Sequence, residues 1–183
     1  MIWVYGGAFN PPTVAHQHII SHIKNMYPQD TFIIVPVGND YQKSTLIDFS
    51  HRYHMCRLAF KEVEISTYEQ DHPFKGTYTL LQQLQQEKHE HVGFIIGADQ
   101  LDQFHTWIEY QKLMKEHHCL IISRQGVIET QQQELLDQFK HYTWIQLDIP
   151  ISSTYIRNNV ESSKPHVDSS VYDYIKKHEL YKE

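Results

Sequence analysis

Three observations predict a doubly wound α/β fold for this sequence of 183 residues. Short apolar runs rich in β-branched residues alternate with runs of helical spacing, the pattern of βαβ units. Glycines directly follow some of the apolar runs, at Gly6 and Gly7 and again at Gly97. The sequence has no internal repeat and no linker-like stretch, so one domain over residues 1–183 is expected. The expected architecture is therefore a Rossmann-like parallel sheet with helices on both faces.

The apolar runs are the expected strands, and the runs between them are the expected helices. The strand candidates are residues 2–5, 31–37, 63–65, 92–96, 119–123 and 142–147. The helix candidates are residues 14–27, 51–61, 77–88, 129–139 and 152–160, a short helix before Trp107, a helix through Met114, and a terminal helix through His178. Ser50 is the expected N-cap of the second helix, and Ser169 or Ser170 that of the last. Residues 66–76 are expected to form a loop.

The composition is that of a globular chain without a strong charge bias. Apolar residues make up 40% and charged residues 21%, and the formal net charge is −6. The sequence has no basic stripe, which argues against nucleic acid as a partner, and no apolar run long enough to span a membrane. Cys56 and Cys119 lie among apolar residues and are expected to be buried free thiols of a soluble, cytoplasmic protein. The sequence has 14 histidines; the spacing of His18 with His22 and of His51 with His54 can bind a metal, but no third ligand stands out, so these are expected to be surface histidines.

The start of the chain has the pattern of a strand, a tight turn and the beginning of a helix. Gly6 and Gly7 end the first apolar run, and Asn10-Pro11-Pro12 can neither continue a strand nor begin a helix. A glycine turn before a helix N-terminus is typical of phosphate-binding sites, because backbone N–H groups there point towards the anion. The sequence contains neither G-x-G-x-x-G nor the Gly-Lys-Ser/Thr of a P-loop, so the phosphate site is of another kind.

Thr13-Val14-Ala15-His16 resembles the (H/T)-x-G-H motif of the adenylyltransferase branch of the nucleotidyltransferase superfamily, with Ala15 in place of the usual glycine. Three further stretches resemble, in the same order, those of the nicotinate or nicotinamide mononucleotide adenylyltransferases. They are Phe94-Ile95-Ile96-Gly97-Ala98-Asp99 with Trp107 shortly after, Ile151-Ser152-Ser153-Thr154-Tyr155-Ile156-Arg157, and the tail over residues 174–181. Residues 52–55 and 77–79 are weaker matches. The family often has Pro-Pro-His-Lys where this chain has Asp40-Tyr41-Gln42-Lys43, and Lys43 is expected to replace that lysine.

The resemblance implies transfer of the adenylyl group of ATP to nicotinate mononucleotide, a step of NAD biosynthesis that gives nicotinate adenine dinucleotide and pyrophosphate. The attacking phosphate is already ionised, so catalysis should come mainly from positioning and from electrostatic stabilisation of the phosphates. The implied catalytic residues are His16, Arg157 and Lys43, with a protonated His16 bonded to an α-phosphate oxygen. Mg²⁺ is expected on the ATP phosphates, with no metal ligands from the protein.

The resemblance also implies which residues bind the two substrates. Those for ATP are Gly7, Ala8, Phe9, Thr13, His16, Gly97, Asp99, Ser152, Ser153, Thr154 and Arg157. Those for the acceptor are Thr79, Trp107 and Ile108, with Trp107 stacked on the pyridine ring. The nicotinate form is expected to be preferred over the nicotinamide form, because backbone N–H groups satisfy a carboxylate better than an amide.

Other interpretations of the same residues remain open. Another nucleotidyltransferase, acting by pantetheine-phosphate or cytidylyl transfer, would share the first motif. A non-catalytic nucleotide-binding module would share the fold, although the presence of both His16 and Arg157 argues against it. In a purely structural interpretation, His16 is a helix-capping residue and Arg157 forms a surface ion pair. The sequence leaves the oligomeric state open, including a homo-oligomer.

Overall fold

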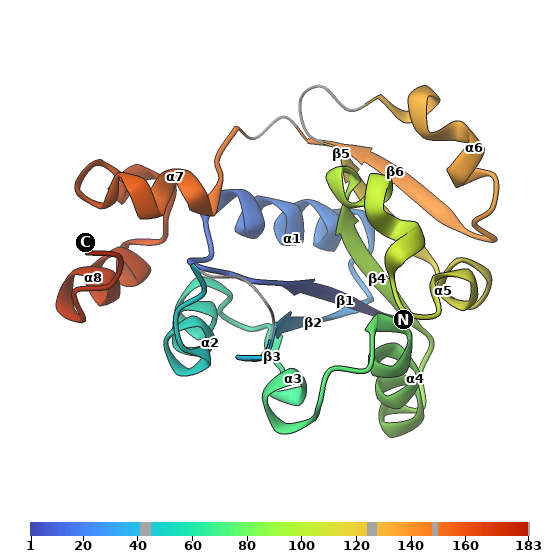
Figure 1. Cartoon of the computed structure of the whole chain (residues 1–183), viewed down its shortest axis with the longest axis horizontal. Coiled ribbons are helices and arrows are strands. Elements are labelled where there is room, and N and C mark those ends of the chain that lie inside the picture. The colour runs from blue at the N-terminus through green and yellow to red at the C-terminus, as the bar shows by residue number, and fades with distance from the viewer. Residues whose placement is uncertain (41–44, 124–127, 148–149, 183) are drawn as a thin grey trace.

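The computed structural model describes residues 1–40, 45–123, 128–147 and 150–182. Its strands form one sheet in the order β3-β2-β1-β4-β5-β6, with parallel neighbours throughout (Figure 1). The strands are β1 (Ile2–Gly7), β2 (Thr31–Pro36), β3 (Glu64–Ile65), β4 (Val92–Gly97), β5 (Cys119–Ser123) and β6 (Tyr142–Gln146). The chain starts in the middle of the sheet and winds outward in both directions. The doubly wound α/β fold expected from the sequence is therefore confirmed.

Helices cover both faces of this sheet. The longer helices are α1 (Val14–Met26), α2 (Phe49–Ala59), α4 (Thr77–Lys88), α5 (Tyr110–Glu116) and α8 (Ser169–Lys177). The shorter ones are α3 (Tyr68–Asp71), α6 (Gln133–Leu136) and α7 (Ser153–Asn158). Turns of 3₁₀ helix span Ala98–Thr106, Glu129–Gln132, Val160–Ser162 and Lys164–His166.

Successive residues of each central strand enter two different cores. Trp3 and Tyr5 of β1 pack with α1, α2 and α8 on one face, whereas Ile2 and Val4 pack with α4 and α5 on the other. A parallel strand that is buried on both faces needs apolar residues at consecutive positions, which explains the continuous apolar runs in the sequence. With both faces covered by helices, the edge formed by the strand ends is the place open to a ligand.

The structure corrects the expected caps of two helices. The carboxylates of Asp48 and Asp168 accept hydrogen bonds from the backbone N–H groups of Ser50 and Ser170, at 2.8 and 2.9 Å. Aspartates, not serines, therefore cap α2 and α8. A carboxylate is as good an N-cap acceptor as a hydroxyl, and its charge also interacts favourably with the helix dipole.

Two other elements differ from the sequence-based expectation. The single helix expected over residues 129–139 is a 3₁₀ turn followed by the four-residue α6. One helical turn, α3, lies within the expected loop over residues 66–76. Both segments are short and mostly exposed, so their conformation depends on a few local contacts, which an apolar pattern does not reveal.

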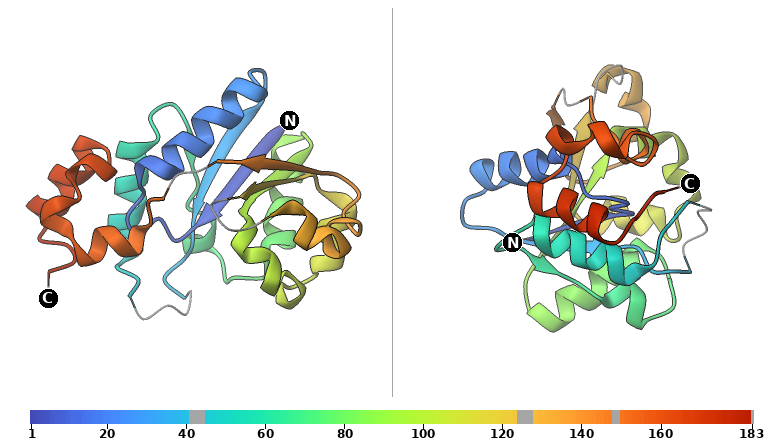
Figure 2. Two further views of the ribbon diagram at one scale, coloured as in Figure 1. Left: turned by 90° about the horizontal axis from the view of Figure 1, so that it is seen from above. Right: turned by 90° about the vertical axis from the view of Figure 1, so that its left-hand side faces the viewer.

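The C-terminal part of the chain packs beside the carboxyl ends of the strands. Figures 1 and 2 show α8 against α2, and Tyr174 of α8 meets His51 of α2, with the Tyr174 hydroxyl 2.9 Å from Nδ1 of the histidine. The Tyr181 hydroxyl donates a hydrogen bond to the side-chain oxygen of Asn10, at 2.9 Å. The chain end thus supports the turn that follows β1. Among the helices that the structure describes, none combines the length and apolar character that a membrane crossing requires.

Candidate active site

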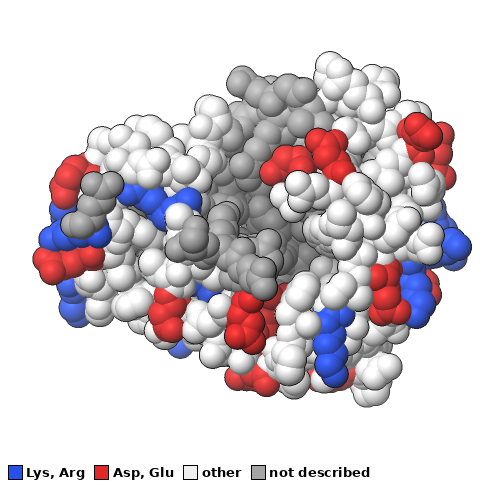
Figure 3. All heavy atoms as spheres, in the orientation of Figure 1, with Lys and Arg blue, Asp and Glu red and all other residues white. Residues whose placement is uncertain are grey.

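A cleft of about 460 Å³ opens at the carboxyl ends of β1 and β4, where the strand order reverses. Its wall includes Gly7 and Ala8 at the end of β1 and Gly97 and Asp99 at the end of β4. Doubly wound sheets bind their ligands in this crevice. The face in Figure 3 is hollowed near its middle. Backbone N–H groups in the turns after the strands are the donors that such a crevice offers to an anion.

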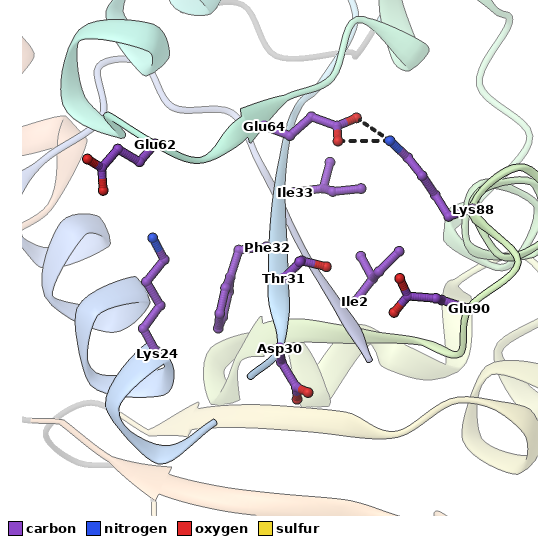
Figure 4. A pocket seen from close by; sticks show the side chains of 10 residues that line it. All are labelled: Ile2, Lys24, Asp30, Thr31, Phe32, Ile33, Glu62, Glu64, Lys88 and Glu90. Atoms are coloured by element: carbon purple, nitrogen blue, oxygen red, sulfur yellow. Dashed lines mark hydrogen bonds and ion pairs between the residues drawn. The ribbon is translucent and has the colours of Figure 1, made fainter. Parts of the chain in front are cut away.

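A second hollow, of about 380 Å³, lies at the opposite edge of the sheet, beside the starts of β1 and β2 (Figure 4). Carboxylates outnumber lysines around it, and Glu64 is already paired with Lys88 at 2.8 Å. Carboxylates repel phosphate groups, and this edge carries the amino ends of the strands rather than the turns that bind anions. The candidate active site is therefore the cleft at the carboxyl ends.

His16 lies in the first turn of α1, directly after the turn over residues 8–12. Its Nδ1 accepts a hydrogen bond from the backbone N–H of Thr13 at 3.0 Å, and the Thr13 hydroxyl lies 2.9 Å from the same nitrogen. The imidazole packs against the ring of the buried Phe9, with ring centroids 5.2 Å apart. A backbone N–H can only donate, so Nδ1 is unprotonated in this contact and the ring proton is on Nε2. This geometry fits a neutral His16, not the protonated one expected from the sequence.

Helix α7 begins against the same turn, although it is more than a hundred residues away in the sequence. The Ser153 hydroxyl donates to the carbonyl of Pro11 at 2.8 Å. The guanidinium of Arg157 donates to the carbonyl of Asn10 at 2.8 Å and to the Thr154 hydroxyl at 3.1 Å. Ser152 caps the helix by accepting the N–H of Tyr155. The helix starts of α1 and α7 therefore share one turn, which brings two sets of N–H donors close to each other.

Trp107 lies in the wall of the cleft, on the segment after the 3₁₀ turns that follow β4. Its indole is half-buried and backed by Phe104, with ring centroids 5.0 Å apart. Ile108, next to it, is 50% exposed at the rim. Glu109 is not in the cleft wall and pairs with Lys112 at 2.5 Å. Trp107 therefore contributes an aromatic ring to the wall of the cleft, and the neighbouring carboxylate of Glu109 is not part of that wall.

The predicted site residues fall into two neighbouring groups and a remainder. Six of them line the cleft: Gly7, Ala8, Gly97, Asp99, Trp107 and Ile108. Seven surround the turn beside it: Phe9, Thr13, His16, Ser152, Ser153, Thr154 and Arg157. Thr79 is in neither group, because its hydroxyl donates to the Lys75 carbonyl and Gly76 and Thr77 form the cleft wall instead. Lys43 lies outside the described residues.

Glu69 is a cleft residue that sequence reasoning missed. The backbone N–H of Gly38, the second residue after β2, opposes the rise in the pKa of this carboxylate. The two segments approach so closely that a Cβ on Gly38 would lie 2.1 Å from the Glu69 carbonyl oxygen, so only glycine fits there. Burial raises the pKa of Glu69 to about 7. Its stretch is polar and loop-like in sequence, and no pattern in it indicates that Glu69 faces the cleft.

Replacing Glu69 with glutamine should stabilise the protein at pH 8 and much less near pH 5. The pKa of this carboxyl rises from 4.5 to about 7 on folding. With respect to this group, the free energy of unfolding is therefore highest below pH 4.5, where Glu69 is protonated in both states, and it falls as the pH rises through 7. A shift of this size corresponds to roughly 3 kcal/mol at most. Urea unfolding of both proteins between pH 5 and pH 8 measures the difference. A stability gain that does not change with pH would contradict this account.

Comparisons with known proteins agree with the fold and identify the class of protein. The cytidylyltransferase-like family model matches residues 4–159. The chain is 34% identical, over all of its length and 98% of the relative, to the probable nicotinate-nucleotide adenylyltransferase of Acholeplasma laidlawii. It is 32% identical to that of Clostridium tetani, over 98% of each protein. The nicotinic acid mononucleotide adenylyltransferase of Plasmodium falciparum, solved with NaAD, is 25% identical and superposes with a TM-score of 0.82 over 98% of this chain and 96% of that one.

The parallel sheet, the glycine turn and the two helix starts that meet at it define a nucleotidyltransferase. The identity and coverage of the sequence matches show the family within this class. The chain belongs to the cytidylyltransferase-like family and, within it, to the nicotinate-nucleotide adenylyltransferases. The family suggested by the sequence motifs is therefore confirmed.

Proposed function

We propose that this chain transfers the adenylyl group of ATP to nicotinate mononucleotide, a step of NAD biosynthesis. The observation that carries the proposal is one cleft whose lining includes both Gly7 and Ala8 of the glycine turn and Trp107. A phosphate oxygen of the acceptor forms a bond to the α-phosphorus, the bond from that phosphorus to the β-phosphate oxygen breaks, and pyrophosphate leaves. The names of the curated relatives and the NaAD bound in the Plasmodium falciparum structure support this choice of acceptor.

His16 acts as a hydrogen-bond donor to the α-phosphate in this proposal. The acceptor phosphate is ionised before it attacks, so no general base is needed, and the difficulty is to hold two polyanions together. The Thr13 N–H fixes the imidazole tautomer so that Nε2 carries the proton. A donor held in place by the protein needs no reorganisation when charge builds on the phosphorus.

Arg157 and the start of α7 hold the β- and γ-phosphates, which become the leaving pyrophosphate. The guanidinium uses two of its N–H groups on Asn10 and Thr154, and the others remain to bond phosphate oxygens. The Ser153 and Thr154 hydroxyls lie at a helix start, where backbone N–H groups also favour anions. Lys43 is proposed as a further cation, on the sequence resemblance alone.

The other wall of the cleft binds the nucleoside parts of the substrates. The Asp99 carboxylate, folded back over Gly97, accepts hydrogen bonds from ribose hydroxyls. Trp107 stacks on the pyridine ring, and Ile108 contributes its backbone. The first turn of α4 reaches the same cleft through Gly76 and Thr77. The N–H groups of a first helical turn have no partner within the helix, and together with the positive end of the dipole they suit the pyridine carboxylate.

Magnesium is proposed to arrive on ATP rather than to occupy a resident site. The described residues hold no group of three or more His, Cys, Asp or Glu arranged to bind a metal ion, and the described carboxylates of the cleft wall are Glu69 and Asp99. Mg²⁺ prefers phosphate and water oxygens when few carboxylates are available, so this donor set fits a metal carried by the triphosphate. Bound in this way, it would neutralise part of the phosphate charge.

The direct test is incubation with ATP, Mg²⁺ and one acceptor at a time, followed by mass spectrometry of the products. The acceptors are nicotinate mononucleotide, nicotinamide mononucleotide and phosphopantetheine, with CTP and choline phosphate as a separate pair. The proposal predicts nicotinate adenine dinucleotide with one pyrophosphate released per product molecule. Product from another acceptor alone would assign a different transfer. ATP binding without any product would indicate a non-catalytic module.

Replacing Arg157 with alanine should raise the KM for ATP, lower kcat, and reduce kcat/KM by roughly tenfold to a hundredfold. Arg157→Lys should recover little of this loss, because a lysine amine cannot reproduce a fork that bonds Asn10 and Thr154 at once. Steady-state kinetics with pyrophosphate detection measures both variants. Full recovery by lysine would show that a point charge is sufficient at this position.

A further inference from the structure

Arg52 is a buried arginine directly behind the phosphate-binding turn. Its side chain, on α2, is 0% exposed and is not among the residues that line the cleft. Nε donates to the carbonyl of Ile47 at 2.8 Å, and Nη1 donates to the carbonyl of Ala8 at 3.1 Å. None of the ion pairs among the described residues includes Arg52, and Nη2 is buried without a hydrogen-bond partner there.

Stability alone does not explain a charged group in this position. Burial lowers the pKa of Arg52, but a guanidinium remains charged in proteins, so a desolvated charge is kept without a carboxylate in contact. Its neighbours Met55 and Cys56 on the same helix are fully buried and fill their space with apolar or weakly polar groups. An apolar side chain would serve packing equally well at residue 52. The two backbone carbonyls that Arg52 holds are therefore the feature to explain.

The contact with Ala8 fixes the orientation of one peptide group in the turn. The Ala8–Phe9 peptide is trans, so its N–H points away from its carbonyl. The Ala8 carbonyl accepts a hydrogen bond from the buried Arg52, so the Phe9 N–H of the same trans peptide is directed away from Arg52. Phe9 has a φ of 44°, in the left-handed region that non-glycine residues rarely adopt. Rotation of this peptide would turn a carbonyl oxygen towards the phosphates in place of an N–H.

The contact with Ile47 ties a second segment to the same turn. Thr45, two residues earlier, accepts a hydrogen bond from the Asn10 side chain at 2.7 Å. Phe49, two residues later, donates its N–H to the side chain of Asn39 at 2.8 Å. Arg52 and Asn10 thus join residues 45–49 to residues 8–10 from two sides, and Arg52 is the member of this pair that carries a charge.

We propose that Arg52 is a positioning residue for adenylyl transfer: it holds the Ala8 carbonyl away from the cleft, so that the Phe9 N–H is directed at the phosphates of ATP. The inference rests on the proposed function and adds a residue that does not itself touch substrate. This positioning role requires the guanidinium with its several N–H groups and not only a positive charge. One lysine amine cannot reach both the Ala8 and Ile47 carbonyls in the same geometry.

The test compares Arg52→Lys, which keeps the charge, with Arg52→Met, which keeps the length without it. Cys56→Ala, one helical turn away on α2 and equally buried, is the packing control. Melting temperature, kcat, the KM values for ATP and acceptor, and the Kd for ATP are measured for each protein. We expect both Arg52 variants to fold, with kcat reduced about tenfold to a hundredfold and weaker ATP binding. The KM for the acceptor should stay within about twofold, since the pyridine contacts lie on another wall.

Three outcomes would overturn the proposal. A folded Arg52→Lys with near wild-type kcat would show that only the charge matters. A Cys56→Ala variant with the same loss of kcat at the same melting temperature would show that α2 packing is responsible. Failure of both Arg52 variants to fold would make Arg52 a folding residue. Failure of the proposed function itself would look different, because the wild type would then form no dinucleotide. The Kd for ATP could still be compared between the wild type and the Arg52 variants.

Discussion

The variant His16→Ala is expected to turn over about a hundredfold more slowly than the wild type, or slower still. The wild-type ring is held by Thr13 and Phe9, so its Nε2 donor is already oriented when charge builds on the α-phosphate. A donor that strengthens mainly in the transition state changes kcat more than substrate binding, so the KM for ATP should change little. Steady-state kinetics with pyrophosphate detection measures both constants. A variant within a few-fold of the wild type would remove His16 from the mechanism.

The matched control is His16→Gln, which tests the tautomer. A glutamine in the third position after a threonine N-cap completes a capping box, so its amide oxygen can accept the Thr13 N–H as Nδ1 does now. Its amide nitrogen then donates in place of Nε2. Activity between that of the alanine variant and the wild type is expected. A His16→Gln variant no more active than His16→Ala would contradict the account in which the Thr13 N–H orients the donor.

The fold was predictable because its strands and helices have strong local patterns. The helix Thr77–Lys88 and the strand Cys119–Ser123 have the bounds expected from the sequence. Each depends on an apolar pattern that tertiary packing reinforces. The caps of α2 and α8 were less predictable, because aspartate and serine stand within two residues of each other and both are good caps. The choice between them depends on backbone geometry at the helix start.

The candidate site was predictable where chemistry follows directly from position in the fold. Residues that follow parallel strands must gather at one edge, which accounts for Gly7, Gly97 and Asp99 in the cleft wall. Arg52 and Glu69 could not be inferred in this way. Both lie on helices between strands, and whether such a residue faces the cleft, the core or solvent depends on how its helix packs. The weak family match over residues 52–55 singled out this stretch, but it did not indicate which groups Arg52 contacts.

Removal of the indole in Trp107→Ala should raise the KM for the acceptor by roughly tenfold to a hundredfold, since stacking on one aromatic face is worth about 1–3 kcal/mol. The ring lies in the cleft wall against Phe104, so its face is presented without rearrangement. Trp107→Phe is the matched control, because it keeps an aromatic face of smaller area. It should raise the KM for the acceptor much less than Trp107→Ala does. An unchanged acceptor KM in Trp107→Ala would place the pyridine elsewhere.

The same wall should favour nicotinate mononucleotide over the nicotinamide form. The first turn of α4 presents backbone donors to the cleft through Gly76 and Thr77, and donors alone satisfy a carboxylate better than an amide whose NH₂ also donates. Glu109, next but one to Trp107 in the sequence, is paired with Lys112 and is not part of the cleft wall, so it does not repel nicotinate. Competition between the two mononucleotides measures the ratio of their kcat/KM values. A ratio near one, or one that favours the amide, would mean that backbone donors do not select the acceptor, even though the chain's family is unchanged.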